Sequence, residues 1–141
     1  MKYIAWAVLS LGLLVAVPVA LEGQQETSGD VELSQNYPNP FNSETTIPFR
    51  LGEDWFKDGH TPLVSIRIYN VLAQLVAIPF LRGTGEVLDG RQLAWNGSGQ
   101  FEAHWDGRYM GTNREAASGV YVYQLMVDGV RVVSRRMSVI R

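Results

Sequence analysis

The chain of 141 residues contains no cysteine and only two histidines. The missing thiol excludes disulfide frameworks, thiolate zinc sites, a thiol nucleophile and a lipidated N-terminal cysteine. Basic residues are not in excess either, because 12 Lys and Arg stand against 14 Asp and Glu and give a net charge of −2. A phosphate backbone is bound by a basic surface, so we expect no nucleic-acid partner. Because disulfides are excluded, the stability of the fold must come from one packed core, and the chain is long enough for a single domain.

Long helical periods are missing as well, and short runs of alternating apolar and polar residues take their place. The predicted strands cover residues 45–51, 63–72, 75–81, 100–105, 120–127 and 130–140. In the last of these the apolar positions change parity, which predicts a β-bulge near Val132. We expect an all-β domain of about seven short strands, and this number favours a β-sandwich over a barrel.

The N-terminus has the pattern of a secretory signal. Lys2 provides a basic start, and residues 3–20 form an apolar run that only Ser10, Gly12 and Pro18 interrupt. We expect residues 1–23 to be a cleaved signal peptide, 24–32 a flexible linker and 33–141 the folded domain. The alternative is a retained transmembrane anchor, since about 18 apolar residues approach the length that crosses a bilayer. In either case the chain is predicted to leave the cytoplasm.

The segment LSQNYPNPFN, residues 33–42, precedes the first long predicted strand. Its prolines fix φ and its asparagines close turns with their side chains, which predicts a rigid lead-in. Further blocks follow in order, namely WDG at 105–107, ASGVYVY at 117–123 and RRM at 135–137. Together they resemble the C-terminal sorting domain of type IX secretion cargo, which is related to the immunoglobulin-like domain of flagellar hook-capping proteins. The resemblance is carried by Pro38, Asn39, Pro40, Trp105, Asp106, Gly107, Ser118, Gly119 and Tyr121.

This resemblance implies an immunoglobulin-like β-sandwich that the outer-membrane type IX translocon recognises as an export signal. It places the protein at the outer cell surface or outside the cell, with the periplasm as a stage in transit. In the family a surface protease often removes the domain and joins the cargo to an anionic lipopolysaccharide. Only nine residues, 24–32, separate the predicted signal peptide from the domain, so we expect no separate cargo. Either the domain is itself the working protein, or the chain is a reduced relative that has lost its passenger.

Four arginines, Arg131, Arg135, Arg136 and Arg141, lie on or just after the last predicted strand. Charge on an edge strand resists pairing with other chains, which is a purely structural interpretation. Under the resemblance, the same strand is the surface that the translocon recognises, by charge or by strand addition. Both interpretations remain open at this point.

Two long connections, 53–60 and 83–99, contain Trp55, Phe56 and Trp95. Exposed aromatic side chains on such loops stack on a glycan or on a protein partner. Loop aromatics also fold back as lids over the end of a sandwich. The alternative function is therefore a stand-alone extracellular binding or structural module that uses the Trp55 and Trp95 loops.

Residues suited to catalysis or metal binding are sparse. His104 and Asp106 match the spacing of a base and its orienting carboxylate, but an Asp before a Gly is more typical of a turn. Asp54 with Asp58, or Asp106 with Asn113, supply oxygen ligands for calcium, but without the spacing of an EF-hand. We expect no enzymatic activity, no cofactor and no metal site.

Overall fold

A computed structural model of the chain describes residues 30–141, without the side chains of Arg131 and Val132. The predicted signal peptide and most of the predicted linker lie outside the described residues. The elements, in order, are β1 (Val31–Leu33), β2 (Thr45–Leu51), the 3-10 helix η3 (Glu53–Gly59), β3 (Leu63–Tyr69), β4 (Leu75–Ala77), β5 (Phe80–Leu81), β6 (Arg91–Gln92), β7 (Gln100–Trp105), β8 (Gly119–Val127) and β9 (Val130–Val139). Within residues 30–141, no helix is long and apolar enough to cross a membrane.

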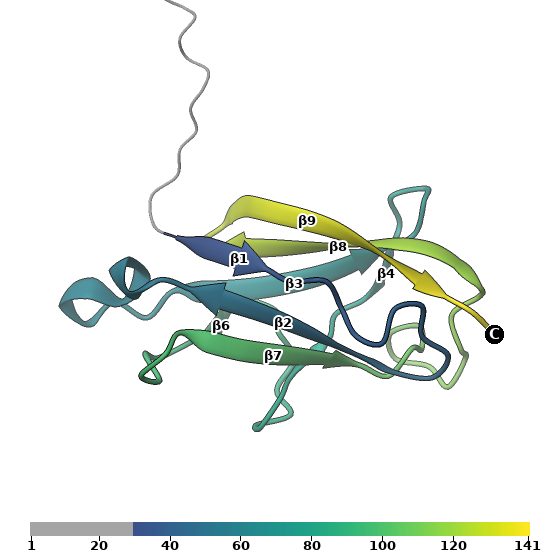
Figure 1. The fold of residues 1–141 in the computed structure, drawn as a ribbon, viewed down its shortest axis with the longest axis horizontal. Helices are drawn as coiled ribbons and strands as arrows, with labels where there is room; N and C mark the ends of the chain where they lie inside the picture. Colours follow the sequence, from purple (N-terminus) through teal and green to yellow (C-terminus); the bar gives the residue numbers. More distant parts are fainter. Residues whose placement is uncertain (1–29) are drawn as a thin grey trace, which may run out of the picture.

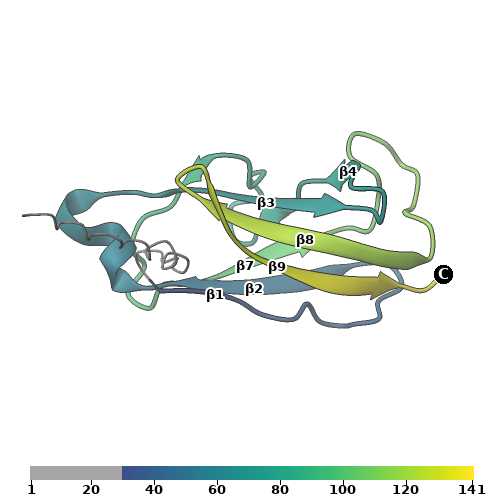
Figure 2. The same ribbon diagram turned by 90° about the horizontal axis from the view of Figure 1, so that it is seen from above.

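The strands form two antiparallel sheets (Figures 1 and 2). Sheet A has the order β1-β2-β7-β5, and sheet B has the order β4-β3-β8-β9 with β6 also paired to β3. Figure 2 shows the two layers from the side, with β3, β8 and β4 in one and β1 and β2 in the other. The predicted all-β class is confirmed, and two stacked sheets agree with the predicted sandwich. The described residues form nine strands rather than about seven, because the predicted run 75–81 is split into β4 and β5, and the short strands β1 and β6 lie outside every predicted range.

The alternation in β2 assigns one face of sheet A to the core and the other to solvent. Ile47, Phe49 and Leu51 are buried, whereas Pro48 and Arg50 between them are half-buried. The partner strand β7 follows the same rule, with Ile47 opposite Ala103. Successive side chains of a strand point to opposite faces, so the local pattern was sufficient to predict both strands.

The strand predicted for residues 63–72 is shorter than expected, because β3 ends at Tyr69. Alternation with Ile66 and Ile68 would place Leu72 on the core face, but this side chain is 73% exposed at the tip of the β3–β4 turn. The Asn70 side chain causes the early end. Its Oδ1 accepts hydrogen bonds from the N–H groups of Leu72 and Gln74, both at 2.9 Å. An Asn that bonds to the following backbone closes a turn in place of a strand ladder.

The apolar run 75–81 is divided between the two sheets. Its first part is β4 in sheet B, and its last part is β5 in sheet A. Pro79 lies between them, where its missing N–H costs no ladder hydrogen bond.

The β8–β9 hairpin turns at Asp128 and Gly129, which have φ values of 52° and 82°. The predicted bulge is present. Leu125 lies opposite Val133 but Met126 lies opposite Arg131, so Val132 is the extra residue on β9. Such an insertion reverses which side chains face the core, and this explains the change of apolar parity in the sequence.

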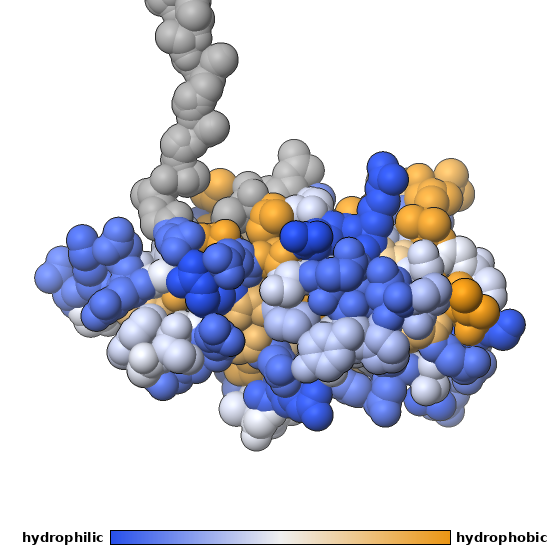
Figure 3. Space-filling model, viewed as in Figure 1, coloured by the Kyte–Doolittle hydropathy of each residue, from blue (hydrophilic) through white to orange (hydrophobic). Residues whose placement is uncertain are grey.

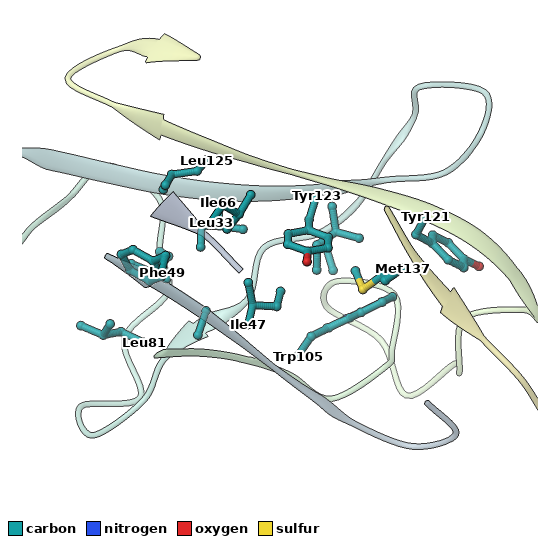
Figure 4. Close-up of a cluster of buried hydrophobic side chains, with 14 of the residues drawn as sticks. Leu33, Ile47, Phe49, Ile66, Leu81, Trp105, Tyr121, Tyr123, Leu125 and Met137 are labelled. Carbon is teal, nitrogen blue, oxygen red and sulfur yellow. The ribbon is translucent and has the colours of Figure 1, made fainter. Parts of the chain in front are cut away.

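The core lies between the sheets and receives side chains from both (Figure 4). Ile47 and Phe49 of β2 and Ile66 and Leu125 of sheet B are all fully or almost fully buried. The long connection 83–99 also contributes, because its Leu88 is 0% exposed. This connection is therefore a packed part of the domain.

The domain begins earlier than expected. The linker was predicted to reach Glu32, but Val31 and Glu32 pair with Leu51 and Arg50 in strand β1. The Arg50 guanidinium also forms ion pairs with Asp30 at 2.6 Å and with Glu32 at 3.2 Å. This strand has only three residues and directly follows a polar stretch, so it is too short for alternation to reveal it.

Candidate functional site

Residues of the segments 33–42, 105–107 and 117–123 meet at the end of the sandwich that holds the C-terminus. The rings of Phe41 and Trp105 lie 5.5 Å apart, and those of Trp105 and Tyr121 lie 5.8 Å apart, both edge to face. Trp105 is 1% exposed, and its Nε1 donates to the Arg108 carbonyl at 3.0 Å. Edge-to-face aromatic pairs add to the stability that burial alone gives. Three segments distant in the sequence are thus joined by one aromatic cluster.

The lead-in segment 33–42 is held by its asparagines. Asn36 is 1% exposed and donates to Thr45 Oγ1 at 2.9 Å, while its own N–H donates to the Tyr123 hydroxyl at 3.0 Å. Asn39 accepts a hydrogen bond from the N–H of Ser138 on β9 at 2.9 Å. The predicted rigid lead-in is therefore tied to both sheets.

The edge of β9 is covered over its C-terminal half. Phe41 donates its N–H to the Ser138 carbonyl at 3.0 Å and accepts the N–H of Ile140 at 2.9 Å. Gln35 donates its Nε2 to the Arg136 carbonyl at 2.8 Å. These backbone groups are the ones that an added strand would need, so this half of β9 has no free edge for β-augmentation.

The four basic candidates have different environments. Arg135 donates from Nε to the Leu33 carbonyl and so connects β9 to β1. Arg136 is exposed, and among the described residues it takes part in no ion pair. The side chain of Arg131 lies outside the described residues. The four arginines consequently do not form one uniform charged surface.

Arg141 acts as a clamp. Its guanidinium donates to three carbonyls, those of Asn42, Gly107 at 2.7 Å and Ala116 at 2.8 Å. Its backbone N–H donates to Ser118 Oγ at 2.8 Å. Only 20% of the side chain is exposed. Charge-assisted hydrogen bonds to three loops make this side chain part of the framework of the fold.

The residues proposed as a catalytic pair are separated by their partners. His104 Nε2 lies 2.9 Å from Glu44 Oε1 on the solvent face of sheet A. Asp106 Oδ1 instead accepts the N–H of Arg108 at 3.0 Å and closes the turn after β7. This is the turn role that Asp-Gly predicted.

The calcium candidates likewise have other contacts. Asp54 pairs with Lys57 at 3.3 Å, and Asp106 serves its turn. Among residues 30–141, no three His, Cys, Asp or Glu side chains form a cluster that could hold a metal ion.

His60, outside every predicted site, lies 2.8 Å from Asp128 Oδ2. Burial alone would raise the pKa of Asp128, but the Leu63 N–H and the His60 imidazole outweigh it and lower this pKa.

The two loop tryptophans differ in exposure. Trp55 is half-buried and packs against the core, whereas Trp95 is 40% exposed. The ring of Trp95 lies 5.2 Å from that of Phe56, so the two long connections meet at one end of the sandwich. Trp55 therefore behaves as a lid over the core, and Trp95 remains available for contact.

Sequence reasoning missed a polar network on the solvent face of sheet A. The Tyr37 hydroxyl donates to Glu102 Oε2 at 3.1 Å, and Arg82 Nη1 donates to Thr46 Oγ1 at 3.0 Å. Arg82 also lies 3.7 Å from Glu102 Oε1. The bond to Glu102 and its charge raise the pKa of Tyr37, which keeps this phenol a proton donor. The only local clue was that Glu102 and His104 alternate outward along β7.

No family model and no curated protein matches the chain. Among solved structures, the chain is similar to an alkylpurine DNA glycosylase from Pseudomonas fluorescens bound to DNA containing an abasic site analog. The two are 16% identical, with a TM-score of 0.46 over 82% of this chain and 32% of the glycosylase chain. The chain thus spans about a third of that enzyme's length. Nothing about activity is transferred at this level of similarity.

Proposed function

We propose that this chain is an immunoglobulin-like sorting domain, exported across the outer membrane by the type IX machinery and displayed or released at the cell surface. The observation that carries the proposal is that the motif residues converge on the C-terminal end of the fold. Phe41, Trp105 and Tyr121 form one cluster there, and Arg141 clamps the loops around it. If the translocon recognises the domain after it has folded, it must bind a folded surface, and this cluster would stabilise such a surface.

We then expect the translocon to recognise charge on β9, at the point where the covered half of its edge begins. The C-terminal half of β9 already pairs with Phe41 and Asn39, which disfavours strand addition there. Arg141 and Arg135 are occupied by backbone carbonyls. Arg136 is the candidate whose described side chain is exposed and free of an ion pair, so it is the residue we expect the translocon to contact.

The test is to express the full chain in a type IX-secreting bacterium and in a matched strain that lacks the translocon. The amount and intact mass of the chain are then measured in the medium, at the surface and in the periplasm. We expect it outside the first strain and in the periplasm of the second. Equal amounts outside both strains, or a full chain with Met1 in the inner membrane, would contradict the proposal.

A charge reversal tests the recognition surface. Arg136→Glu should lower the exported fraction several-fold without changing the melting temperature. Lys57→Glu makes the same change of charge on η3, at the opposite end of the molecule (Figure 1), and should leave export unchanged. If both variants export equally well, Arg136 is not a recognition residue. The export role itself would still be decided by the comparison of strains.

A further inference from the structure

The solvent face of sheet A is hollowed where the polar network lies. Three adjoining depressions, of about 620, 360 and 510 Å³, all include Arg82 in their walls. Glu102 lines the first two, and His104 lines the last two. In Figure 3 the atoms over β2 and β7 are mostly blue or pale rather than orange. We call this region the sheet A strip, and its side chains are Tyr37, Glu44, Thr46, Phe80, Arg82, Glu102 and His104.

The strand register places four of these residues in one row. Tyr37 lies opposite Thr46, Thr46 opposite His104, and His104 opposite Phe80. Three strand spacings separate the two ends, a distance of about 14 Å. The aromatic ends are accessible, with Tyr37 51% and Phe80 37% exposed. The row therefore has a ring at each end and polar side chains between them.

A second row runs beside the first. Glu102 lies opposite Pro48 on one side, and its carbonyl accepts the N–H of Arg82 on the other at 2.8 Å. The bonds of Glu102 to Tyr37 and of Arg82 to Thr46 join the two rows. These contacts hold the polar tips in place before any ligand arrives, which lowers the entropy lost on binding.

The chemistry of the strip selects its ligand. Glu44 and Glu102 accept hydrogen bonds, Arg82 donates them, and Tyr37 and His104 do either. A hydroxyl group both donates and accepts hydrogen bonds, so a polyhydroxylated ligand can bond to all of these side chains. Two carboxylates and one guanidinium give a local charge of −2 + 1 = −1, which disfavours phosphate and sulfate groups. Aromatic faces at the ends suit the apolar faces of sugar rings.

We propose that the sheet A strip binds a neutral oligosaccharide. Tyr37 and Phe80 stack against sugar rings at the two ends, and Arg82, Glu102 and His104 bond to hydroxyl groups between them. This role goes beyond the proposed export function and does not depend on it. It also differs from a site at the Trp55 and Trp95 loops.

The test is a titration of the isotope-labelled full chain with maltohexaose, cellohexaose and mannohexaose, followed by NMR. At least one should shift the amides of Tyr37, Glu102 and His104 saturably, with a Kd of about 1 mM or tighter. A sulfated heparin hexasaccharide should shift these amides less than the neutral ligand does. If none of the three neutral hexasaccharides binds, or if the sulfated one binds more tightly, the proposal is overturned.

Variants locate the site. Tyr37→Ala and Phe80→Ala should each raise the Kd about tenfold, whereas Tyr37→Phe keeps the ring and should change it far less. Trp95→Ala is the matched control, because it removes an aromatic side chain of similar exposure outside the strip and should have no effect. Amide spectra of the free variants verify the fold. Loss of binding in Trp95→Ala with normal binding in Tyr37→Ala would move the site to the tryptophan loops and overturn the proposal.

Discussion

At the residue scale, the last side chain of the chain connects loops that are far apart in the sequence. Arg141 donates to the carbonyls of Asn42, Gly107 and Ala116. Gly107 allows this approach, because its φ is 73° and a Cβ there would lie 2.5 Å from the Ser43 carbonyl oxygen. Arg141 and Gly107 therefore act together, because the clamp needs the backbone at Gly107 to pass this close to Ser43.

Arg141→Ala should lower the free energy of unfolding by about 2 kcal/mol, because three backbone carbonyls lose a charged donor. Urea unfolding followed by tryptophan fluorescence measures the change. The control is Arg136→Ala, an exposed arginine of the same strand region, which should stay within about 0.5 kcal/mol of the parent protein. Equal unfolding midpoints for the two variants would show that the clamp adds nothing to stability.

A pair of glycines separates backbone strain from steric overlap. Gly107 and Gly111 have the same φ of 73°, but a Cβ at Gly111 would meet nothing within 4 Å. Gly111→Ala should therefore cost about 1 kcal/mol from the left-handed conformation alone. Gly107→Ala adds the clash with Ser43 and should cost at least twice as much, or prevent folding. Similar melting temperatures for the two variants would contradict the close approach.

At the scale of elements, hydrogen bonds from side chains decide where strands end and how the sheets join. Asn70 ends β3 by binding the backbone of Leu72 and Gln74. Tyr123 of β8 donates its hydroxyl to the Ser34 carbonyl at 2.7 Å and so joins sheet B to the lead-in of sheet A. Both effects come from polar groups placed among apolar strands.

The β3–β4 turn gives a contrast between two neighbours. Asn70→Ala should lower the free energy of unfolding by about 1 to 2 kcal/mol, because the N–H groups of Leu72 and Gln74 lose their acceptor. Leu72→Ser should change it by less than about 0.5 kcal/mol, since that side chain is exposed. Chemical denaturation of both variants checks this. A larger loss from Leu72→Ser than from Asn70→Ala would place Leu72 in the core after all.

At the scale of the whole molecule, both sheets share one core. The ionisation of its tyrosines makes the stability of the fold depend on pH in the alkaline range. Burial and a hydrogen bond with Tyr109 raise the pKa of Tyr121 to about 12. Burial also raises the pKa of Tyr123, against the Asn36 N–H and Arg135, which lower it. In the unfolded chain both phenols ionise near pH 10. The folded protein thus holds these protons to higher pH than the unfolded chain does.

Stability should be constant with respect to these groups below about pH 10 and should fall as pH rises toward about 12, because the unfolded state then binds fewer protons. Urea midpoints measured at intervals across this range test the prediction. Tyr121→Phe removes one of the groups and should flatten the slope, whatever it does to the midpoint at neutral pH. A midpoint that does not fall above about pH 10 would contradict the prediction.

The sequence by itself determined most strands and the bulge at Val132. Alternation is a local property, so β2 and β7 follow from which residues are apolar, and Asp128-Gly129 marks a hairpin without tertiary information. The early start at Val31 and the early end at Tyr69 were not predicted, because backbone pairing and a side-chain bond decide them.

Only the tertiary structure decided which side chains meet. His104 could be paired with Asp106 by spacing, but the fold gives it Glu44, and it brings Tyr37 and Phe80 to the ends of one row. These residues lie on strands or segments that are distant in the chain, and their neighbours depend on how strands align across a sheet. A shift of one residue in that alignment would turn each side chain to the other face. The candidate site is therefore a property of strand register, which composition and local pattern leave undetermined.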